Sequence, residues 1–535
     1  CLPWSGSGIT ETVRSAGGYL TVEDDVYSRA CVHSAAEGLE VAQRIGFPVM
    51  IKASEGGGGK GIRMCREPES FVRLYNTAVG EVPGSPIFVM KLAGQARHLE
   101  VQLLADQYGN AISVFGRDCS VQRRHQKIIE EAPVSVAPRE ACAAMEAAAV
   151  RLAKLVGYVS AGTVEWLYSP DTGEFAFLEL NPRLQVEHPT TEMVSGINIP
   201  ATQLLIAMGV PLHRVPDVRA FFRYERDGAA PIAFDALDAA HTPQPMGHVI
   251  ACRVTAENPD TGFKPGLGAF AELTFRASPA TWGYFSVGAG GALHEYADSQ
   301  FGHVFAHGRD RGDARTQMVY ALKELSIRAD FCTTVEYLVQ LLEMDEFRAN
   351  AVTTAWLDGL IARQLMSVRP ARDVAVVCGA VVKAHVQVRE CTEEYKRIMH
   401  RGQAPPRTTL STEFPVDFIY ERQKYQFVAR RCAADGWRLE LNGGHTLVQV
   451  RELADGGLLI ALAGHTYTVY YRDEVGQTRL LIDGRTCVIE QENDPTQICT
   501  PSPGKLVRLL AASGDHVAGG QPIAEIEVMK MYLPL

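Results

Sequence analysis

The sequence has no C-x-x-C pair, although twelve cysteines are scattered along its 535 residues. That scatter is a poor pattern for a zinc site or a disulfide framework, and reduced thiols are expected. No apolar run approaches the ~20 residues that a membrane span needs, so membrane insertion is not expected. The formal net charge is −10, which argues against bulk attraction to nucleic acid or to an anionic membrane.

The length argues against a single core, and three or four domains are expected. Residues 34–46 and 139–157 have the spacing of amphipathic helices that end at glycine. Strand-like runs lie on both sides of a glycine-rich stretch near residue 57, and "AGTVEWLYS" with "FAFLEL" predicts a hairpin. Residues 246–290 are strand-rich and residues 312–346 are helical in pattern.

The last third has a different character. Residues 369–414 are mixed and are predicted to form a connector. From 415 to 491, short strands alternate with the turn signals "LNGGHT", "LADGGLL" and "LIDGRT", which predicts a small antiparallel barrel or sheet. A further set of short strands follows "NDPTQICTPSPG".

The stretch "IKASEGGGGKGIRM" (51–64) places four glycines between Lys52 and Lys60. It is not a Walker A loop, because Ser54 replaces the first glycine and Gly61 replaces the Mg²⁺-binding Ser or Thr. It also joins two predicted strands, whereas a Walker A loop leads from a strand into a helix. Glycine lets the backbone approach phosphate oxygens and lysine adds charge, so a flap over a triphosphate is predicted. An ordinary surface hairpin is the alternative.

Five polar residues recur at every second position of "FLELNPRLQVEHPTTE" (177–192), namely Glu179, Asn181, Arg183, Gln185 and Glu187. In an extended backbone they share one face. Carboxylate and amide oxygens suit Mg²⁺, so Glu179 and Asn181, with Glu165 nearby, are candidate metal ligands. Arg183 is a candidate anion-binding group and Glu187 a candidate general base. The alternative is a solvated strand edge, which Pro182 favours.

A basic cluster lies in "DCSVQRRHQKIIEEAP" (118–133), where Gln122, His125 and Lys127 are candidates for binding an anionic substrate. An ordinary solvated basic face is the alternative interpretation.

Together these motifs resemble the biotin carboxylase component of biotin-dependent carboxylases, an ATP-grasp enzyme. The resemblance implies an α+β fold, with an ATP-grasp domain, a biotin carboxylase C-terminal domain, a β-rich barrel-like linker domain and a truncated all-β biotinyl domain. The implied boundaries are a remnant of an N-terminal subdomain (1–20), the ATP-grasp lid (21–92), the ATP-grasp core (93–245), the C-terminal domain (246–368), a connector (369–414), the linker domain (415–495) and the biotinyl piece (496–535).

The resemblance also implies roles for individual residues. Nucleotide contacts are expected from Lys52, Gly56, Gly57, Gly58, Gly59, Lys60, Met90, Lys91, Ala93, His98, Gln122 and His125. The bicarbonate pocket is expected from Lys127, Arg183, Gln185, Val186 and Glu187, with Glu187 as the base. The metal site is expected from Glu165, Glu179 and Asn181. Arg253, in "IACRVTAENP", is expected to hold phosphate or to stabilise the biotin enolate.

The implied reaction uses ATP, Mg²⁺ or Mn²⁺, and biotin attached covalently to Lys530 of "AEIEVMKM". Bicarbonate is phosphorylated to carboxyphosphate, whose CO₂ passes to biotin. "DSQFGH" (298–303) and "TPSPGKL" look most like multidomain eukaryotic acetyl-CoA carboxylase, which makes malonyl-CoA for fatty acid synthesis. Expected partners are a biotin protein ligase, a downstream carboxyltransferase domain and a second copy in a homodimer. The expected location is the cytoplasm, with the plastid as an alternative.

Other readings stay open. The chain also suits a propionyl-CoA or pyruvate carboxylase, and more distantly an ATP-grasp ligase that joins a carboxylate to an amine. A non-catalytic ATP-grasp scaffold is the alternative of another class. Because the N-terminal subdomain and the end of the biotinyl domain are expected to be missing, little activity is expected from this fragment alone.

Overall fold

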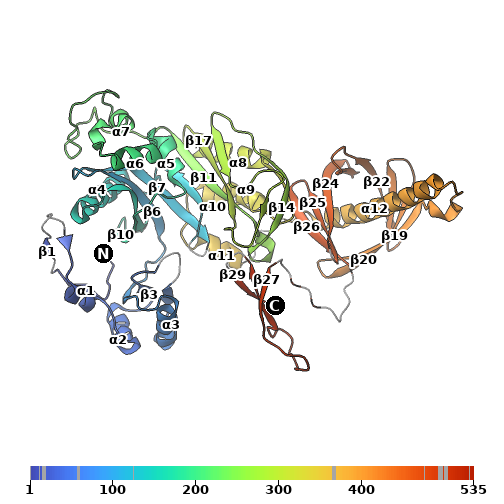
Figure 1. The fold of residues 1–535 in the computed structure, drawn as a ribbon, viewed down its shortest axis with the longest axis horizontal. Coiled ribbons are helices and arrows are strands. Elements are labelled where there is room, and N and C mark those ends of the chain that lie inside the picture. Colours follow the sequence, from blue (N-terminus) through green and yellow to red (C-terminus); the bar gives the residue numbers. More distant parts are fainter. Residues whose placement is uncertain are drawn as a thin grey trace.

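The computed structural model describes residues 2–10, 13–14, 20–56, 61–123, 126–363, 369–474, 476–491, 498, 500, 504–528 and 531–535. Six predicted site residues lie outside this set: Gly57, Gly58, Gly59, Lys60, His125 and Lys530. The described part is an elongated row of domains, with the N-terminal elements at one end and a barrel at the other (Figure 1). Within it, no helix combines the length and the apolar character of a membrane span.

The first domain is a three-stranded antiparallel sheet, in the order β4-β3-β5, which packs against two helices. Its elements are α2 (Ala35–Ile45), β3 (Val49–Ala53), β4 (Ile62–Cys65), α3 (Pro68–Glu81) and β5 (Ile87–Lys91), preceded by β1 (Val13–Arg14), β2 (Leu20–Thr21) and α1 (Asp24–Ala30). The predicted helix is confirmed: the Ser34 hydroxyl accepts a bond from the Glu37 amide, and Gly46 ends α2 with a φ of 83°. The glycine run connects β3 to β4, as predicted.

The centre of the molecule is an eight-stranded antiparallel sheet in the order β10-β9-β6-β7-β8-β11-β17-β15. Its strands are β6 (Arg97–Ala105), β7 (Ala111–Arg123), β8 (Gln126–Ala132), β9 (Ser160–Tyr168), β10 (Phe175–Asn181), β11 (His248–Thr255), β15 (Thr281–Phe285) and β17 (Gln300–Gly308). The predicted hairpin is confirmed as β9 and β10. Because β8 pairs with β11, the sheet runs without a break from the predicted ATP-grasp core into the predicted C-terminal domain.

Helices cover this sheet. They are α4 (Arg139–Val156), α5 (His188–Ser195), α6 (Ile199–Ala207) and α7 (Pro216–Phe221). The predicted helix at 139–157 is confirmed, and Gly157 caps α4 in the left-handed conformation.

The prediction that residues 179–187 form one extended row is wrong in its second half. Strand β10 ends at Asn181, and α5 begins at His188 with Glu187 as its N-cap residue. Pro182 explains the early end, because proline has no N–H to continue the ladder. Gln185 and Glu187 are nevertheless buried, since the loop turns them back toward the sheet, whereas Glu179 and Arg183 are exposed.

The next domain adds a small sheet, β16-β14-β18, and four helices to the same core. The strands are β14 (Gly268–Thr274), β16 (Ala292–Leu293) and β18 (Ser326–Ala329), and β12 (Glu257–Asn258) pairs separately with β13 (Lys264–Pro265). The helices are α8 (Arg311–Glu324), α9 (Val335–Glu343), α10 (Asp345–Arg348) and α11 (Trp356–Ala362). The predicted helical character of 312–346 is confirmed for α8 and α9, but the segment between them contains strand β18.

The predicted barrel is closed and has eight strands. They are β19 (Glu413–Tyr420), β20 (Gln423–Arg431), β21 (Gly436–Leu441), β22 (Gly444–Glu452), β23 (Leu458–Leu462), β24 (His465–Glu474), β25 (Gln477–Ile482) and β26 (Arg485–Glu490). Two of the turn signals form as expected. Asn442-Gly443 and Asp483-Gly484 both have positive φ angles, which two-residue hairpin turns require.

The connector prediction for 369–414 is wrong. Most of this segment is a 29-residue helix, α12 (Arg372–His400), which lies among the barrel strands in Figure 1. Its first half is buried on every side, from Val374 to Ala384, and shares one core with Phe418 and Ile489 of the barrel. A helix that is apolar all round must be surrounded by protein. The mixed pattern of 369–414 arises because only this first half is inside the barrel.

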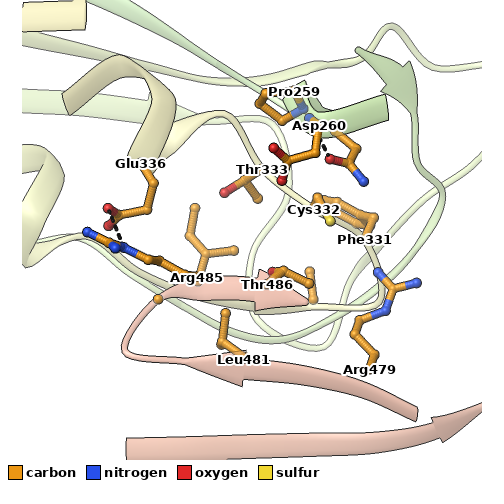
Figure 2. A pocket seen from close by; sticks show the side chains of 14 residues that line it. Pro259, Asp260, Phe331, Cys332, Thr333, Glu336, Arg479, Leu481, Arg485 and Thr486 are labelled. Atoms are coloured by element: carbon orange, nitrogen blue, oxygen red, sulfur yellow. Dashed lines mark hydrogen bonds and ion pairs between the residues drawn. The ribbon is translucent and has the colours of Figure 1, made fainter. Parts of the chain in front are cut away.

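The barrel meets the preceding domain through polar groups. A cavity of about 60 Å³ lies between them. Figure 2 shows its lining, with Asp260, Cys332 and Glu336 from one domain and Arg479 and Arg485 from the other. Ion pairs cross this contact, including Arg328–Asp455 at 3.3 Å and Arg485–Glu336 at 3.9 Å. Such a polar contact is typical of domains that adjust relative to each other.

The C-terminal piece is a three-stranded sheet of β27 (Lys505–Leu509), β28 (Ala524–Val528) and β29 (Met531–Pro534). Ile526 and Val528 are buried in the core that contains α8, α9 and α11. This piece therefore packs against the domain before the barrel, as Figure 1 also shows.

Glu146 on α4 predicts a pH-dependent stability, because burial raises the pKa of its carboxyl group to about 7. The folded chain therefore holds a proton that the unfolded chain releases above about pH 4.3, so stability falls as pH rises from about 4.5 to 7. We expect Glu146→Gln to raise the free energy of unfolding at pH 8 by up to about 3 kcal/mol. Urea denaturation at pH 5 and pH 8 measures this. An equal effect at both pH values would contradict it.

Candidate active site

The site is centred on Lys127, whose ammonium lies among three buried carboxylates. Lys127 Nζ is 2.6 Å from Glu100 Oε2, 2.9 Å from Glu165 Oε1 and 2.6 Å from Glu187 Oε1. These side chains come from β6, β8, β9 and the start of α5. Sheet pairing explains their meeting, since Glu100 and Glu165 are directly opposed across β6 and β9.

Arg117 of β7 ties the same cluster to the loop before α5. Its Nε donates to Glu100 at 2.5 Å, and its two terminal nitrogens donate to Thr191 and Gln185, both at 2.7 Å. Arg117 is fully buried. Gln185 donates in turn to Glu165 at 3.1 Å. This arginine therefore holds the non-strand half of the predicted row against the sheet.

Arg253 of β11 completes the cluster from the other half of the sheet. One terminal nitrogen lies 3.1 Å from Glu187, and Nε donates to Glu130 of β8 at 2.5 Å. Glu187 thus contacts two cations, Lys127 and Arg253, that come from different parts of the chain.

These cations decide the protonation state of Glu187. Burial and the neighbouring Glu100 carboxylate both raise its pKa, but Lys127, Arg253 and Arg117 lower it, and the net pKa lies below the ordinary value. Burial would also lower the pKa of Lys127, yet the surrounding carboxylates raise it well above its ordinary value. At neutral pH both groups are charged, so Glu187 is able to accept a proton.

The predicted metal ligands lie together beside this cluster. Glu179 and Glu165 are directly opposed across β10 and β9, and Asn181 Nδ2 donates to one oxygen of each at 3.1 Å. His98 contacts the second oxygen of Glu165 at 2.8 Å. Two carboxylates and an amide within reach of one another fit the oxygen ligands of Mg²⁺. Lys127 also contacts Glu165, so this carboxylate already has a cationic partner here.

A second group of possible ligand atoms overlaps this one. His98, Glu100 and Glu165 lie within 4.8 Å of one another and are buried. Glu100 is engaged by Lys127 and Arg117. The Glu165–Glu179–Asn181 set is the better match to Mg²⁺, because Glu179 is exposed and Asn181 is only half-buried.

The predicted nucleotide residues occupy β3, β5 and the β6 side of the site. Lys52 of β3 lies near Glu179, whose charge partly offsets the lowering of the Lys52 pKa by burial. Met90 and Ala93 are half-buried, and Gly56 lies just before the undescribed part of the loop. Lys91 is different: its ammonium donates to the carbonyls of Gly46 and Phe47 at 2.8 and 3.0 Å. Its side chain is thus tied to the end of α2.

Of the predicted bicarbonate residues, Lys127, Gln185 and Glu187 lie in the cluster, and two others do not. Arg183 is exposed, and its guanidinium donates to the neighbouring Leu184 carbonyl at 3.3 Å. Val186 is 37% exposed. Gln122 is buried directly opposite Lys127, at the β7–β8 turn.

Four family models match consecutive parts of the chain. They describe the ATP-binding domain of carbamoyl-phosphate synthase L chain (21–215), a biotin carboxylase C-terminal domain (251–359), the BT domain of acetyl-CoA carboxylase (372–490) and a biotin-requiring enzyme (496–535). The third match begins with α12, which agrees with the burial of that helix inside the barrel.

A solved biotin carboxylase from Campylobacter jejuni, described as a β-γ-ATP complex, is 32% identical to this chain. The alignment covers 62% of this chain and 69% of that one, with a TM-score of 0.54. The chain belongs to the biotin carboxylase family. The biotin carboxylase domain dimer of the 2-oxoglutarate carboxylase from Hydrogenobacter thermophilus, solved with MgADP and bicarbonate, is also 32% identical, with a TM-score of 0.55 and 68% of that chain covered.

Longer relatives extend the match over the whole chain. Acetyl-CoA carboxylase dmxL1 of Cryptosporiopsis is 57% identical over 540 residues, and acetyl-CoA carboxylase of Schizosaccharomyces pombe is 56% identical over 541 residues. Each alignment covers 100% of this biotin carboxylase chain but 24% of the relative. The chain therefore spans about a quarter of the length of these acetyl-CoA carboxylases.

Sequence reasoning missed three buried charges of this biotin carboxylase site: Glu100, Arg117 and Glu130. Each lies in a strand whose other residues are largely buried. A charged residue inside such a run needs a buried partner. That was the available signal, because "HLEVQLLA" and "VFGRDCSVQ" each carry an ionisable residue within a predicted inner strand.

Removing the central cation should destabilise the protein in a pH-dependent way. We expect Lys127→Met to lower the free energy of unfolding by about 3–5 kcal/mol at pH 8, because it leaves buried carboxylates without their shared partner. Their pKa values then rise, so protonation relieves part of the loss as pH falls toward 5. Denaturation curves at both pH values measure this.

Lys154→Met is the matched control. Lys154 pairs with Asp235 at 2.7 Å, but the aspartate is largely exposed, so the expected cost is about 0–1 kcal/mol at either pH. Equal costs for the two substitutions would show that the buried cluster has no special need of its lysine.

Proposed function

We propose that this chain catalyses the ATP-dependent carboxylation of biotin by bicarbonate. The observation that most directly supports this proposal is the contact of one buried carboxylate, Glu187, with both Lys127 and Arg253. A base and two anion-stabilising cations at one point are what phosphorylation of bicarbonate requires. A degenerate scaffold has no need to keep such buried charges.

The proposed sequence of events begins with Glu187, which accepts the proton of bicarbonate. The resulting oxyanion attacks the γ-phosphorus of ATP. The bond between that phosphorus and the oxygen bridging to the β-phosphate breaks, so ADP departs and carboxyphosphate is formed. Lys127 and Arg253 offset the negative charge that develops during this transfer. Carboxyphosphate then releases CO₂ and phosphate within the same enclosed cluster.

Two groups would be held by named residues. Glu165, Glu179 and Asn181 would hold Mg²⁺ or Mn²⁺, which supplies charge neutralisation at the phosphates. Biotin on Lys530 would supply the ureido nitrogen that accepts CO₂. We assign Arg253 to the stabilisation of that acceptor, because its guanidinium lies beside Glu187.

Nucleotide binding is assigned to the lid and the hinge. Lys52, the glycine run Gly56–Gly59 and Lys60 would contact the phosphates, and Met90, the Lys91 backbone, Ala93 and His98 would lie at the adenosine. Gln122 and His125 would face nucleotide or bicarbonate, and Arg183, Gln185 and Val186 would line the bicarbonate pocket. Arg183 would have to turn inward when anion is bound, since it is exposed here.

At the level of the whole protein, we propose the first half-reaction of an acetyl-CoA carboxylase that makes malonyl-CoA for fatty acid synthesis. The whole-chain identity of 57% to a relative with that name supports this over a propionyl-CoA or pyruvate carboxylase. The proposed partners are a biotin protein ligase, a carboxyltransferase domain on the same polypeptide and a second copy of the chain. The proposed location is the cytosol, although relatives named mitochondrial also match.

We propose the domain boundaries that were predicted from the sequence, with one change. They are a remnant (1–20), lid (21–92), ATP-grasp core (93–245), C-terminal domain (246–368), barrel domain (to 495) and biotinyl piece (496–535). The barrel domain is proposed to begin near Arg372, because α12 is inside the barrel.

Glu187→Gln tests the proposed reaction. The amide cannot accept the bicarbonate proton, so we expect kcat for bicarbonate-dependent ATP cleavage to fall at least about 100-fold. The affinity for ATP should stay within about threefold of the wild type, because Glu187 lies at the bicarbonate end. Steady-state kinetics and nucleotide titration of the full-length protein measure the two.

Glu174→Gln, at an exposed carboxylate just before β10, is the matched control and should leave both quantities unchanged. If Glu187→Gln kept the wild-type rate, the residue would not be the base. If the wild-type protein itself cleaved no ATP in the presence of bicarbonate, a non-catalytic scaffold would be the better interpretation of this chain.

Biotin attachment is tested separately through Lys530. We expect Lys530→Arg to abolish the streptavidin signal of the full-length protein, since the guanidinium cannot form the amide bond. Lys505→Arg in β27, which is exposed in the same piece, should leave the signal intact. A signal that survived Lys530→Arg would move the attachment to another lysine.

A further inference from the structure

A row of polar side chains crosses four neighbouring strands of the central sheet and includes Arg253. Tyr284 of β15 is directly opposite His303 of β17, and His303 is directly opposite Arg253 of β11. Glu130 of β8 is diagonal to Arg253, since it opposes Ala251. Directly opposed residues of antiparallel strands point to the same face, so these four side chains form a line across the sheet.

Contacts join the same four side chains in the order Tyr284, His303, Glu130 and Arg253. The Tyr284 hydroxyl lies 3.4 Å from His303 Nδ1, and His303 Nε2 lies 3.2 Å from Glu130 Oε2. The other oxygen of Glu130 accepts from Arg253 Nε at 2.5 Å. Arg253 then reaches Glu187 with a terminal nitrogen at 3.1 Å.

Two members of the row are fully buried and therefore need hydrogen-bond partners. Glu130 and His303 are both 0% exposed, whereas Tyr284 is 40% exposed at the sheet edge. A buried carboxylate needs partners for both oxygens. Among the described residues, Arg253 contacts one oxygen of Glu130 and His303 contacts the other. Phe305 packs on His303, with ring centroids 4.3 Å apart, and limits its movement.

We infer that His303 is a positioning residue for the proposed bicarbonate phosphorylation: it orients Glu130, and Glu130 fixes the guanidinium of Arg253 opposite Glu187. His303 itself lies beyond Glu130 and touches no reacting group. Without its bond, Glu130 has one partner, and the attraction between Glu130 and Arg253 is free to draw the guanidinium away from Glu187. This inference rests on the proposed function.

Four substitutions in the full-length protein test it. His303→Leu and His303→Asn remove the contact, since leucine has no donor and asparagine is too short to reach Glu130. His303→Gln keeps a donor of similar reach. His307→Gln is the matched control on the same strand, because His307 contacts the Met246 carbonyl at 2.7 Å, outside the row.

For bicarbonate-dependent ATP cleavage, we expect His303→Leu and His303→Asn to lower kcat about 10- to 100-fold, as for a small misplacement of a catalytic group. KM for ATP should stay within about twofold. His303→Gln should retain kcat within about threefold, and His307→Gln should match the wild type. If His303→Leu does not fold, the Asn–Gln pair alone decides, because both are neutral amides that differ in reach.

A second comparison separates positioning from general destabilisation. In an Arg253→Met background, His303→Leu should lower kcat no further, because the group that it positions is gone. The same fractional loss in both backgrounds, or a wild-type kcat in His303→Asn, would overturn the inference. An inactive wild type would overturn the proposed function, and the inference with it, so the two failures are distinguishable.

Discussion

The shared ion pairing of Lys127 is the interaction on which the site depends. Three carboxylates, Glu100, Glu165 and Glu187, converge on one ammonium in a buried region. Any one of them alone would favour its neutral form there. Together with Arg117 and Arg253, the lysine keeps them ionised, and the same arrangement sets the positions of base, metal ligand and anion-binding groups. Stability and chemistry therefore depend on the same charges.

The continuity of the central sheet makes this arrangement possible. The ATP-grasp strands and the C-terminal strands form one antiparallel sheet through the β8–β11 pairing. Lys127 and Glu130 lie on one side of this junction, and Arg253 lies on the other. A site built across two independent domains would change its geometry whenever the domains moved. Here hydrogen-bonded strands fix the distance between the cations.

Much of the fold could be predicted from the sequence because the relevant signals are local. The helix cap at Gly46, the hairpin turn at Asp483-Gly484 and the strands around the glycine run depend on near neighbours. The helix α12 could not be recognised, because burial inside the barrel is a tertiary property and its exposed second half obscures the apolar pattern. Pro182 signalled the end of β10, yet the two-residue spacing of polar groups favoured a longer strand.

The site shows the same division. Glu165, Asn181, Gln185 and Glu187 were named from a sequence pattern and lie together, whereas Glu100, Arg117 and Glu130 were not named. Their strands are separated from the 179–187 segment by long stretches of chain, so no spacing rule links them. Arg183 had the right spacing but is exposed, because the chain turns after Pro182 and only Gln185 and Glu187 face the sheet.

The position of α12 constrains how its domain is made. The helix precedes every barrel strand in the chain, and its first half occupies the space that the strands enclose. Barrel closure joins β19 to β26, the two ends of the strand series. The helix is therefore already synthesised when the first barrel strand emerges, and in the folded domain it fills the lumen. A chain cut between α12 and β19 would leave the barrel strands without the apolar surface on which they pack.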